Sequence, residues 1–269
     1  MIKINNQKII ISRFPDNTKL FTTTSLPQGI YRWGRVDMPI QINWHYESDD
    51  ELISLMYITK HLRAHEATNI GLIMPYIPNA RMDRVKSHTD IFTLKYFTEF
   101  INSLEFDYVT VLDPHSYVSE ALINNIRVMN PGDYIADTIT DCNPNLLFFP
   151  DEGAMKRYSN LYLKEYAFGI KRRDWTTGQI QGLDVAGCVD KIKDSRILIV
   201  DDICSKGGTF YHSAKKLKEL GAKEIYLYVT HCENTILEGE LLTSGLIEKV
   251  YTTNSIFTKE HEKIEVFEI

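Results

Sequence analysis

The chain has no apolar stretch that is long enough to cross a membrane. A transmembrane helix needs about 20 predominantly apolar residues, and no comparable run occurs in the 269 residues. The first residues, Met-Ile-Lys-Ile-Asn-Asn-Gln-Lys, also lack the apolar core of a signal peptide. We therefore expect no membrane partner and a cytoplasmic location.

Cysteine is scarce, and basic residues are not in excess. The four cysteines form no Cys-x-x-Cys pair, which predicts free thiols in a reducing compartment. The formal net charge is −6 and the isoelectric point is about 5.8, whereas proteins that bind nucleic acid without sequence preference usually carry a basic surface. We expect no nucleic-acid partner. Small anionic substrates stay open, because they need only local positive charge.

Apolar runs of strand length alternate with helical patterns along the whole chain. Such alternation predicts mostly parallel sheets with helices on both faces. The predicted strands include residues 70–74, 108–112, 146–149, 166–170, 197–200 and 224–229. The predicted helices include residues 49–64, 89–104, 119–126 and 210–220. We predict an α/β fold of two doubly wound domains, residues 1–145 and 146–269.

The segment 196–209 is the most informative part of the sequence. It reads Arg-Ile-Leu-Ile-Val-Asp-Asp-Ile-Cys-Ser-Lys-Gly-Gly-Thr, which predicts a buried strand, a turn and a helix start. Asp201 and Asp202 should lie at the carboxyl end of the strand, where open α/β sheets bind ligands. The glycines and the free N–H groups of the helix start suit a phosphate, and the acids suit ribose hydroxyls. The residues expected to hold the phosphate are Ser205, Lys206, Gly207, Gly208 and Thr209.

With five other segments, in the same order, this segment resembles the ribose-phosphate pyrophosphokinases. The other segments are 13–16 (Arg-Phe-Pro-Asp), 75–84 (Pro-Tyr-Ile-Pro-Asn-Ala-Arg-Met-Asp-Arg), 113–115 (Asp-Pro-His), 150–153 (Pro-Asp-Glu-Gly) and 171–173 (Lys-Arg-Arg). Segment 75–84 separates this family from plain phosphoribosyltransferases, which share only the phosphate turn. The resemblance implies two phosphoribosyltransferase-like domains, the first on the ATP-binding side and the second on the ribose-phosphate side.

The resemblance also implies a reaction, a cofactor and an assembly. The reaction is transfer of the β,γ-diphosphate of ATP to the anomeric hydroxyl of ribose 5-phosphate, which yields phosphoribosyl diphosphate and AMP. The cofactor is Mg²⁺, and the assembly is a homodimer or larger homo-oligomer. Positions that match ATP-binding residues are Phe14, Asp16, Arg81, Arg84 and His115, and in the family the loop matching Phe14 and Asp16 contacts ATP of a neighbouring subunit. Positions that match metal-binding residues are His115 and Asp151, and those that match catalytic residues are Lys171 and Arg173.

The residue types suit these roles. The planar guanidinium groups of Arg81 and Arg84 could neutralise a triphosphate. Lys171 and Arg173 precede a polar loop and could stabilise charge on a transferring diphosphate, while closure of the loop would exclude water. Trp175 in this loop either stacks on a base or pins the loop. Taken alone, such basic residues are usually surface features.

Lys206 departs from the family, which usually has threonine at this position. A long cationic side chain in the phosphate turn could meet a second phosphate. This suggests ADP-ribose as an alternative acceptor for the same chemistry, in NAD salvage. The plainer interpretation is a lysine that points into solvent. The chain also has Met82 where the family usually has glutamine, and it is shorter than typical members.

Two further function classes stay open. A phosphoribosyltransferase would need the phosphate turn but not segment 75–84. A catalytically silent regulatory subunit would usually lack loop or metal residues, and here Lys171, Arg173, His115 and Asp151 are all present. His61 and His65 stand four apart in a predicted helix and could bind a metal ion, but no third ligand is evident nearby in the sequence, which favours a solvated helix face.

Overall fold

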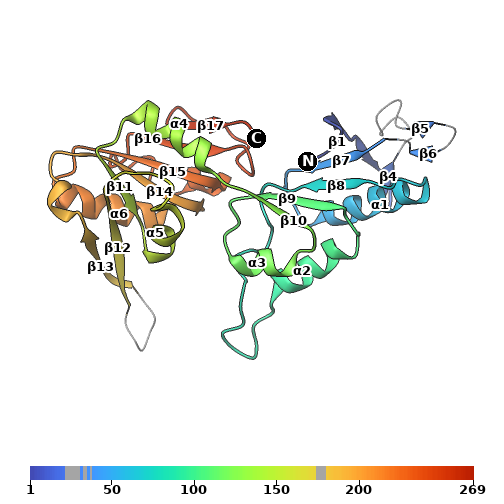
Figure 1. Cartoon of the computed structure of the whole chain (residues 1–269), viewed down its shortest axis with the longest axis horizontal. Coiled ribbons are helices and arrows are strands. Elements are labelled where there is room, and N and C mark those ends of the chain that lie inside the picture. The colour runs from blue at the N-terminus through green and yellow to red at the C-terminus, as the bar shows by residue number, and fades with distance from the viewer. Residues whose placement is uncertain (22–30, 33–34, 37, 174–179) are drawn as a thin grey trace. The chain divides into compact units, whose positions relative to one another are not determined.

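The chain divides into two compact units, Met1–Met129 and Asn130–Ile269 (Figure 1). The computed structural model describes residues 1–21, 31–32, 35–36, 38–173 and 180–269. The contacts between residues divide the chain between residues 129 and 130, whereas the sequence predicted a boundary between residues 145 and 146. The segment in between contains helix α4 (Gly132–Cys142), whose buried Ile135 and Cys142 pack in the core of the second unit. That the first domain binds ATP and the second binds ribose phosphate stays a prediction.

The first unit contains a mostly parallel sheet in the strand order β10-β9-β8-β7-β1-β2. Its strands are β1 (Ile2–Ile4), β2 (Gln7–Lys8), β7 (Ile40–Trp44), β8 (Ile70–Ile73), β9 (Tyr108–Leu112) and β10 (Ile126–Met129). Strands β7 to β10 are parallel, and β1 pairs antiparallel with both β7 and β2. The helices are α1 (Asp50–Ala64), α2 (Thr93–Asn102) and α3 (Tyr117–Leu122).

Helix α1 shows why these segments fold as they do. Its buried residues are Ser54, Leu55, Ile58, Thr59 and Leu62, which form one stripe at helical spacing. The stripe packs in the same core as the sheet strands. Two small antiparallel pairs complete the unit: β3 (Ile11–Arg13) with β4 (Lys19–Phe21), and β5 (Tyr31–Arg32) with β6 (Arg35–Val36).

The second unit contains a sheet in the order β13-β12-β11-β14-β15-β16-β17. Its strands are β11 (Leu146–Phe149), β12 (Tyr166–Arg173), β13 (Ile180–Gly187), β14 (Arg196–Cys204), β15 (Glu224–Cys232), β16 (Lys249–Thr253) and β17 (Ile264–Phe267). All neighbours are parallel except β12 and β13. Its helices, besides α4, are α5 (Glu152–Tyr158) and α6 (Gly208–Glu219), with short 3₁₀ segments η2 (Val189–Lys191) and η3 (Asn234–Glu238).

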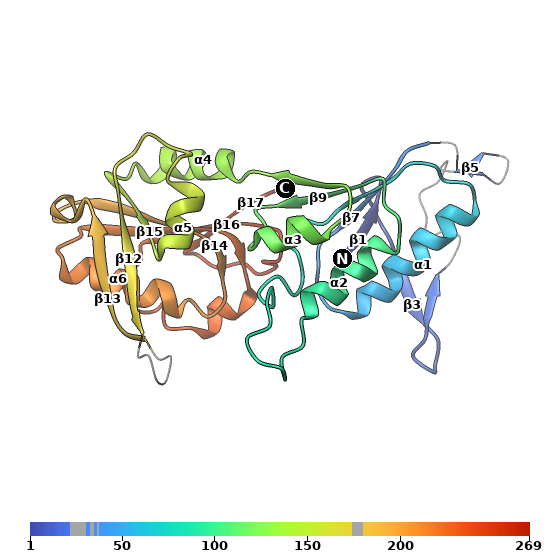
Figure 2. The same cartoon turned by 60° about the horizontal axis from the view of Figure 1, so that its bottom comes forward.

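The sheet of the second unit is buried on both faces. Along β14, Ile197 and Ile199 belong to one core, which includes residues of α6. Leu198 and Val200 belong to a separate core, which includes residues of α4 and α5. Figure 2 shows α4 and α5 on one side of this sheet and α6 on the other. Because successive side chains of a strand point to opposite faces, both faces of this sheet are covered by helices. This arrangement confirms the doubly wound α/β class.

Several element bounds differ from the expected ones. Strand β14 continues to Cys204 instead of ending at residue 200, because its partner β15 is equally long and pairs with it along its length. Asp201 and Asp202 therefore lie inside the strand. The helix expected at residues 119–126 is α3, which ends at Leu122, and residues 126–129 form β10 instead. The loop expected at 174–182 has its last residues in β13, while 174–179, including Trp175, lie outside the described residues.

None of the helices in the described part of the chain has both the length and the apolar composition needed to span a bilayer.

Candidate functional site

The two strand acids of the second unit are held in place by neighbouring groups. Asp202 is 6 % exposed, and its Oδ2 accepts a hydrogen bond from Nη1 of Arg157 at 3.0 Å. The backbone N–H of Asp202 donates to Oδ1 of Asp201 at 3.0 Å. A buried carboxylate is costly without a partner, and the guanidinium in the last turn of α5 supplies one.

Sequence reasoning missed Arg157. The residue follows the Pro-Asp-Glu-Gly segment, but it is separated by 45 positions from the acid that it contacts. No local spacing rule reports a pair of this kind. The only signal in the sequence was the need of a buried carboxylate for a cationic partner, which does not select one arginine from the others.

The phosphate turn has the geometry that a close ligand approach requires. Gly207 precedes the first residue of α6 and has φ +80°. A Cβ there would be strained and would lie 2.9 Å from the side chain of Leu241. A Cβ on Gly208 would meet nothing within 4 Å, so the start of the helix faces open space. Because glycine offers no side-chain cap, the first N–H groups of α6 are left for water or an anion.

Lys206 extends from this turn toward η3. Its Nζ lies 3.1 Å from Oε2 of Glu238, and the two side chains are 66 % and 62 % exposed. The backbone of the turn is packed closely at the same place, since a Cβ on Gly239 would lie 1.9 Å from the carbonyl oxygen of Lys206. The backbone is therefore fixed, while the exposed ion pair contributes little and can exchange partners.

Asp151 lies at the same edge of the sheet as the strand acids. It caps α5, and its Oδ1 accepts hydrogen bonds from the N–H groups of Gly153 at 3.0 Å and Ala154 at 3.1 Å. It follows Phe148 by three positions, as Asp202 follows Ile199, and Phe148 pairs with Ile199 in parallel register. The structure thus brings Asp151, Asp201, Asp202 and the phosphate turn to one carboxyl edge.

The basic segment expected to be catalytic ends strand β12. The backbone of Lys171–Arg173 pairs antiparallel with β13, with an irregularity of register between Arg172 and Arg173. Because β12 is parallel to β11, this end of the strand belongs to the same carboxyl edge. The side chains of these residues lie outside the described part of the structure, so their roles stay predictions.

In the first unit, Asp83 joins two of the expected segments. Its Oδ1 accepts from Nε of Arg84 at 2.8 Å, and its Oδ2 accepts from Nη2 of Arg84 at 3.1 Å and from Oγ of Ser116 at 2.8 Å. Ser116 follows His115 in the loop after β9. The hydrogen bonds from Arg84 hold the pKa of Asp83 below its ordinary value, with smaller contributions from Ser116 and from the charges of Arg84 and His115, while burial acts in the opposite direction.

Asp83 therefore holds Arg84 beside the loop that carries His115. Arg81 and Arg84 are both exposed, as a site for a highly charged ligand requires. The two residues expected to bind metal, His115 and Asp151, belong to different compact units. Among the residues that the structure describes, no three His, Cys, Asp or Glu side chains are grouped as a metal site.

Comparison with known proteins shows which families the chain resembles. Residues 165–242 match the phosphoribosyl transferase domain. The chain is 28% identical over 263 residues to a ribose-phosphate pyrophosphokinase of Pyrococcus abyssi, covering 95% of this chain and 86% of that one. A ribose-phosphate pyrophosphokinase of Thermococcus kodakarensis is 26% identical over 263 residues, covering 93% and 86%. The chain is similar over nearly its whole length to these ribose-phosphate pyrophosphokinases.

A solved structure of the same kind confirms the fold. The crystal structure of phosphoribosylpyrophosphate synthetase from Mycobacterium smegmatis superposes with a TM-score of 0.74 at 17% identity, covering 97% of this chain and 85% of that one. The chain accordingly has the two-domain phosphoribosyltransferase-like fold. Its similarity to enzymes named ribose-phosphate pyrophosphokinases identifies it as a transferase. The domain match at 165–242 includes the phosphate turn and segment 171–173.

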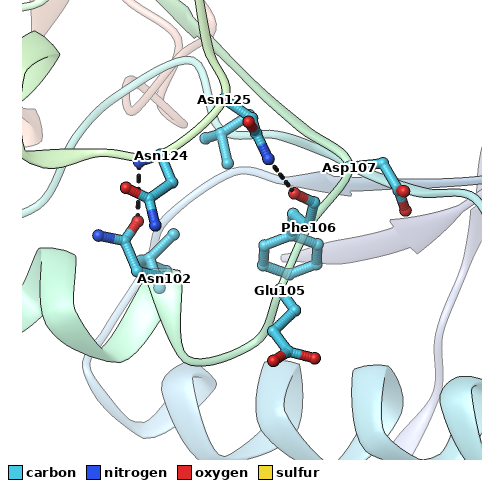
Figure 3. Close-up of a pocket in the computed structure, with 8 residues that line it drawn as sticks. Asn102, Glu105, Phe106, Asp107, Asn124 and Asn125 are labelled. Atoms are coloured by element: carbon cyan, nitrogen blue, oxygen red, sulfur yellow. Dashed lines mark hydrogen bonds between the residues drawn. The ribbon is translucent and has the colours of Figure 1, made fainter.

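A pocket in the first unit (Figure 3) is lined by residues that lie outside the segments resembling the pyrophosphokinases. It is lined by Ile101, Asn102, Glu105, Phe106, Asp107, Val109, Asn124 and Asn125. Most of these residues directly precede β9 or β10, so the pocket opens at the amino edge of the parallel strands. Two of its amides already hold the backbone: Oδ1 of Asn102 accepts from N–H of Asn124 at 2.9 Å, and Nδ2 of Asn125 donates to the Phe106 carbonyl at 3.1 Å. Open α/β sheets bind ligands at the opposite edge.

His61 and His65 lie side by side on α1, with ring centroids 4.3 Å apart. Nδ1 of His65 is 2.9 Å from the carbonyl oxygen of His61. Burial lowers the pKa of His61, and the neighbouring His65 adds to this effect. His61 is exposed and His65 half-buried, and among the described residues no third His, Cys, Asp or Glu is grouped with them.

We expect Arg157→Ala to lower the free energy of unfolding by about 3 kcal/mol, because the buried Asp202 carboxylate loses its partner. Lys156→Ala is the matched control, since Lys156 lies on the same helix and forms only an exposed pair with Glu152, and it should change stability by no more than about 0.5 kcal/mol. Urea unfolding followed by circular dichroism measures both. Equal stability of the two variants would contradict the assigned importance of the Arg157–Asp202 pair.

The lowered pKa of Asp83 predicts a pH-dependent contribution to stability. A carboxyl group with a depressed folded-state pKa stabilises the fold above its unfolded pKa of about 3.9, and this contribution is lost as the pH falls through the lower folded-state value. Asp83→Asn should therefore be less stable than the wild type at pH 7 by about 1 kcal/mol, and the difference should shrink below about pH 4. Denaturant unfolding of both proteins at several pH values measures this. A difference independent of pH would refute the explanation.

Proposed function

We propose that the protein transfers the β,γ-diphosphate of ATP to the anomeric hydroxyl of ribose 5-phosphate and releases AMP. One observation carries this proposal: Asp83 accepts hydrogen bonds from Arg84 and from Ser116. These hydrogen bonds join segment 75–84 to the loop of His115 in the first unit. A plain phosphoribosyltransferase does not need this contact between the two segments, because it uses only the phosphate turn. The proposal assigns the nucleotide to residues of the first unit and the acceptor to residues of the second.

The geometry of the second unit supports the proposed acceptor residues. The N–H groups at the start of α6 would bind the 5-phosphate together with Ser205 and Thr209, and Gly207 and Gly208 permit its close approach. Asp201 and Asp202 would accept hydrogen bonds from the ribose hydroxyls. Arg157 keeps Asp202 oriented and compensates its charge. This arrangement would fix the anomeric carbon relative to the sheet edge.

The chemical step needs orientation and charge stabilisation more than a strong base. The anomeric oxygen would attack the β-phosphorus, and the bond from that phosphorus to the oxygen shared with the α-phosphate would break. AMP leaves with that oxygen, and the proton of the anomeric hydroxyl is released. Lys171 and Arg173 would stabilise the charge on the transferring diphosphate. Phe14, Asp16, Arg81, Arg84 and His115 would hold the nucleotide.

Mg²⁺ fits the oxygen donors of this chain. The ion prefers carboxylate and phosphate oxygens and keeps several waters, so it needs few protein ligands. Asp151 offers a carboxylate whose orientation is fixed by two backbone N–H groups, and we propose it as a Mg²⁺ ligand. We propose His115, in the first unit, as a Mg²⁺ ligand as well. When bound, the ion would neutralise triphosphate charge. We also propose a homo-oligomer, as the family resemblance implies.

Replacement of Lys171 tests the catalytic assignment. In Lys171→Ala, AMP release from Mg–ATP and ribose 5-phosphate should fall by about 100-fold or more, because a charge that stabilises the transition state is removed. Binding of ribose 5-phosphate, measured by calorimetry, should change by no more than about threefold. Lys215→Ala is the control, since Lys215 is an exposed lysine on α6. Normal turnover of Lys171→Ala would refute the assignment.

ADP-ribose is the second candidate acceptor, and the placement of Lys206 favours it. The ammonium group extends from the phosphate turn and pairs with Glu238, and both side chains are exposed. Such a pair is broken at little cost, so Lys206 could turn to a second phosphate. The same diphosphate transfer would then yield ADP-ribose 1-diphosphate.

AMP release with each acceptor offered alone distinguishes the two candidates. If ADP-ribose is the substrate, Lys206→Thr should raise its KM by about tenfold, whereas ribose 5-phosphate as substrate predicts a change of no more than about threefold. Glu238→Gln serves as the control for simple loss of the surface pair. AMP release with neither acceptor would refute the proposed function and favour a phosphoribosyltransferase or a silent regulatory subunit.

A further inference from the structure

The turn that carries Phe14 and Asp16 is fixed by its own hydrogen bonds. It joins β3 and β4, and the N–H of Phe14 donates to the carbonyl of Thr18 at 2.9 Å. Oδ1 of Asp16 accepts from the N–H of Thr18 at 3.0 Å and from its hydroxyl at 2.7 Å. These hydrogen bonds lower the pKa of Asp16. Phe14 remains 48 % exposed at this turn, so a flat ligand can reach its ring.

The hairpin itself is short and little buried. Strands β3 and β4 have three residues each, none of them fully buried, and an isolated two-stranded hairpin is at best marginally stable in water. Its position must therefore come from contacts with another element. Ile11 and Phe21 pack against the core of the first unit, and α1 supplies the polar contacts described next.

One carboxylate of α1 holds both strands of the hairpin. Oδ2 of Asp50 accepts from Nη2 of Arg13 at 2.6 Å and from Nζ of Lys19 at 2.6 Å. Arg13 and Lys19 face each other across the hairpin, directly at the base of the turn. The side chain of Lys19 is 8 % exposed, and its Nζ also donates to the buried Ser54 at 2.8 Å.

Two further contacts hold the hairpin, in addition to those of Asp50; together we call them the anchor. Nη1 of Arg13 donates to the carbonyl of Asn17 at 2.7 Å, so the arginine held by Asp50 also holds the turn. The ring of Phe21, at the end of β4, packs edge-on against Tyr57 of α1 with centroids 5.9 Å apart. The chain of contacts therefore runs from α1 through Asp50 and Arg13 to the residues beside Phe14.

We propose that Asp50 is a positioning residue for the nucleobase of ATP, which acts through Arg13 and Lys19 to hold the Phe14 turn in its binding geometry. This inference rests on the proposed function, in which Phe14 and Asp16 contact the nucleotide. A preorganised aromatic ring binds a purine without the entropic cost of ordering the turn. Asp50 itself does not touch the nucleotide, so its effect is transmitted through the hairpin.

The test is a double-mutant cycle of Asp50→Asn and Phe14→Ala. Asp50→Asn should raise the KM for ATP by about tenfold and leave the acceptor KM and kcat within about threefold, because only nucleobase binding depends on the turn. The second replacement should add little to the first, since both act on the same contact. Asp50→Glu, which keeps the charge, should recover part of the loss.

Asp49→Asn is the matched control. Asp49 precedes Asp50, and its Oδ1 accepts from the hydroxyl of Tyr46 at 2.9 Å instead of from the hairpin. If Asp50→Asn lowers the thermal stability of the whole protein, Lys19→Met gives the same test from the hairpin side. Additive effects of Asp50→Asn and Phe14→Ala, or an equal loss of kcat and acceptor binding, would overturn the proposal.

Calorimetry of ATP binding separates this proposal from the reaction. If the wild type binds ATP but releases no AMP, the proposed reaction fails, while weaker ATP binding by Asp50→Asn than by Asp49→Asn still supports the anchor. Equal binding of ATP by the two variants overturns the anchor whether or not AMP is formed. A wild-type protein that binds no ATP overturns both.

Discussion

The parallel pairing of β14 between β11 and β15 is the constraint on which the second unit depends. This strand is apolar on both faces, so one set of side chains is buried with α6 and the other with α4 and α5. With both faces covered, a shift of β14 by one residue would exchange the side chains that fill the two cores, and the close packing of these cores opposes such a shift. The carboxyl ends of the strands then meet at one edge, and the acids that follow the apolar runs are brought together there.

In both units, carboxylates join segments that are far apart in the sequence. Asp202 is paired with Arg157 of a helix, Asp83 joins Arg84 to the loop of His115, and Asp50 holds the hairpin of Phe14. In each case the acid contacts groups on a different segment, so it fixes a position that the local backbone cannot fix. Charge-assisted hydrogen bonds suit this purpose, because they are strong and directional.

The hydrophobic periodicity of the sequence predicted some helices and strands correctly and missed others. Helix α1 and strands β8, β9, β11 and β15 were predicted near their observed positions, since each has a long apolar pattern of one period. Strand β14 was expected to end before its acids, and β10, β13 and β17 were not expected as strands. These segments carry polar or mixed side chains, and they are strands because a neighbouring strand pairs with them. Pairing of this kind is a tertiary property that local sequence does not report.

By itself, the sequence determined the α/β class, the family resemblance and the residue types of the expected site. Motifs such as segment 196–209 are local, and their chemistry follows from the order of the residues. Only the tertiary structure decided that Arg157 is the partner of Asp202, that Glu238 pairs with Lys206 and that Asp50 holds the hairpin. The reason is physical: these ion pairs join side chains from separate elements, and the sequence contains many acidic and basic residues that could equally well be the partners. Which of them meet depends on how the helices and strands pack.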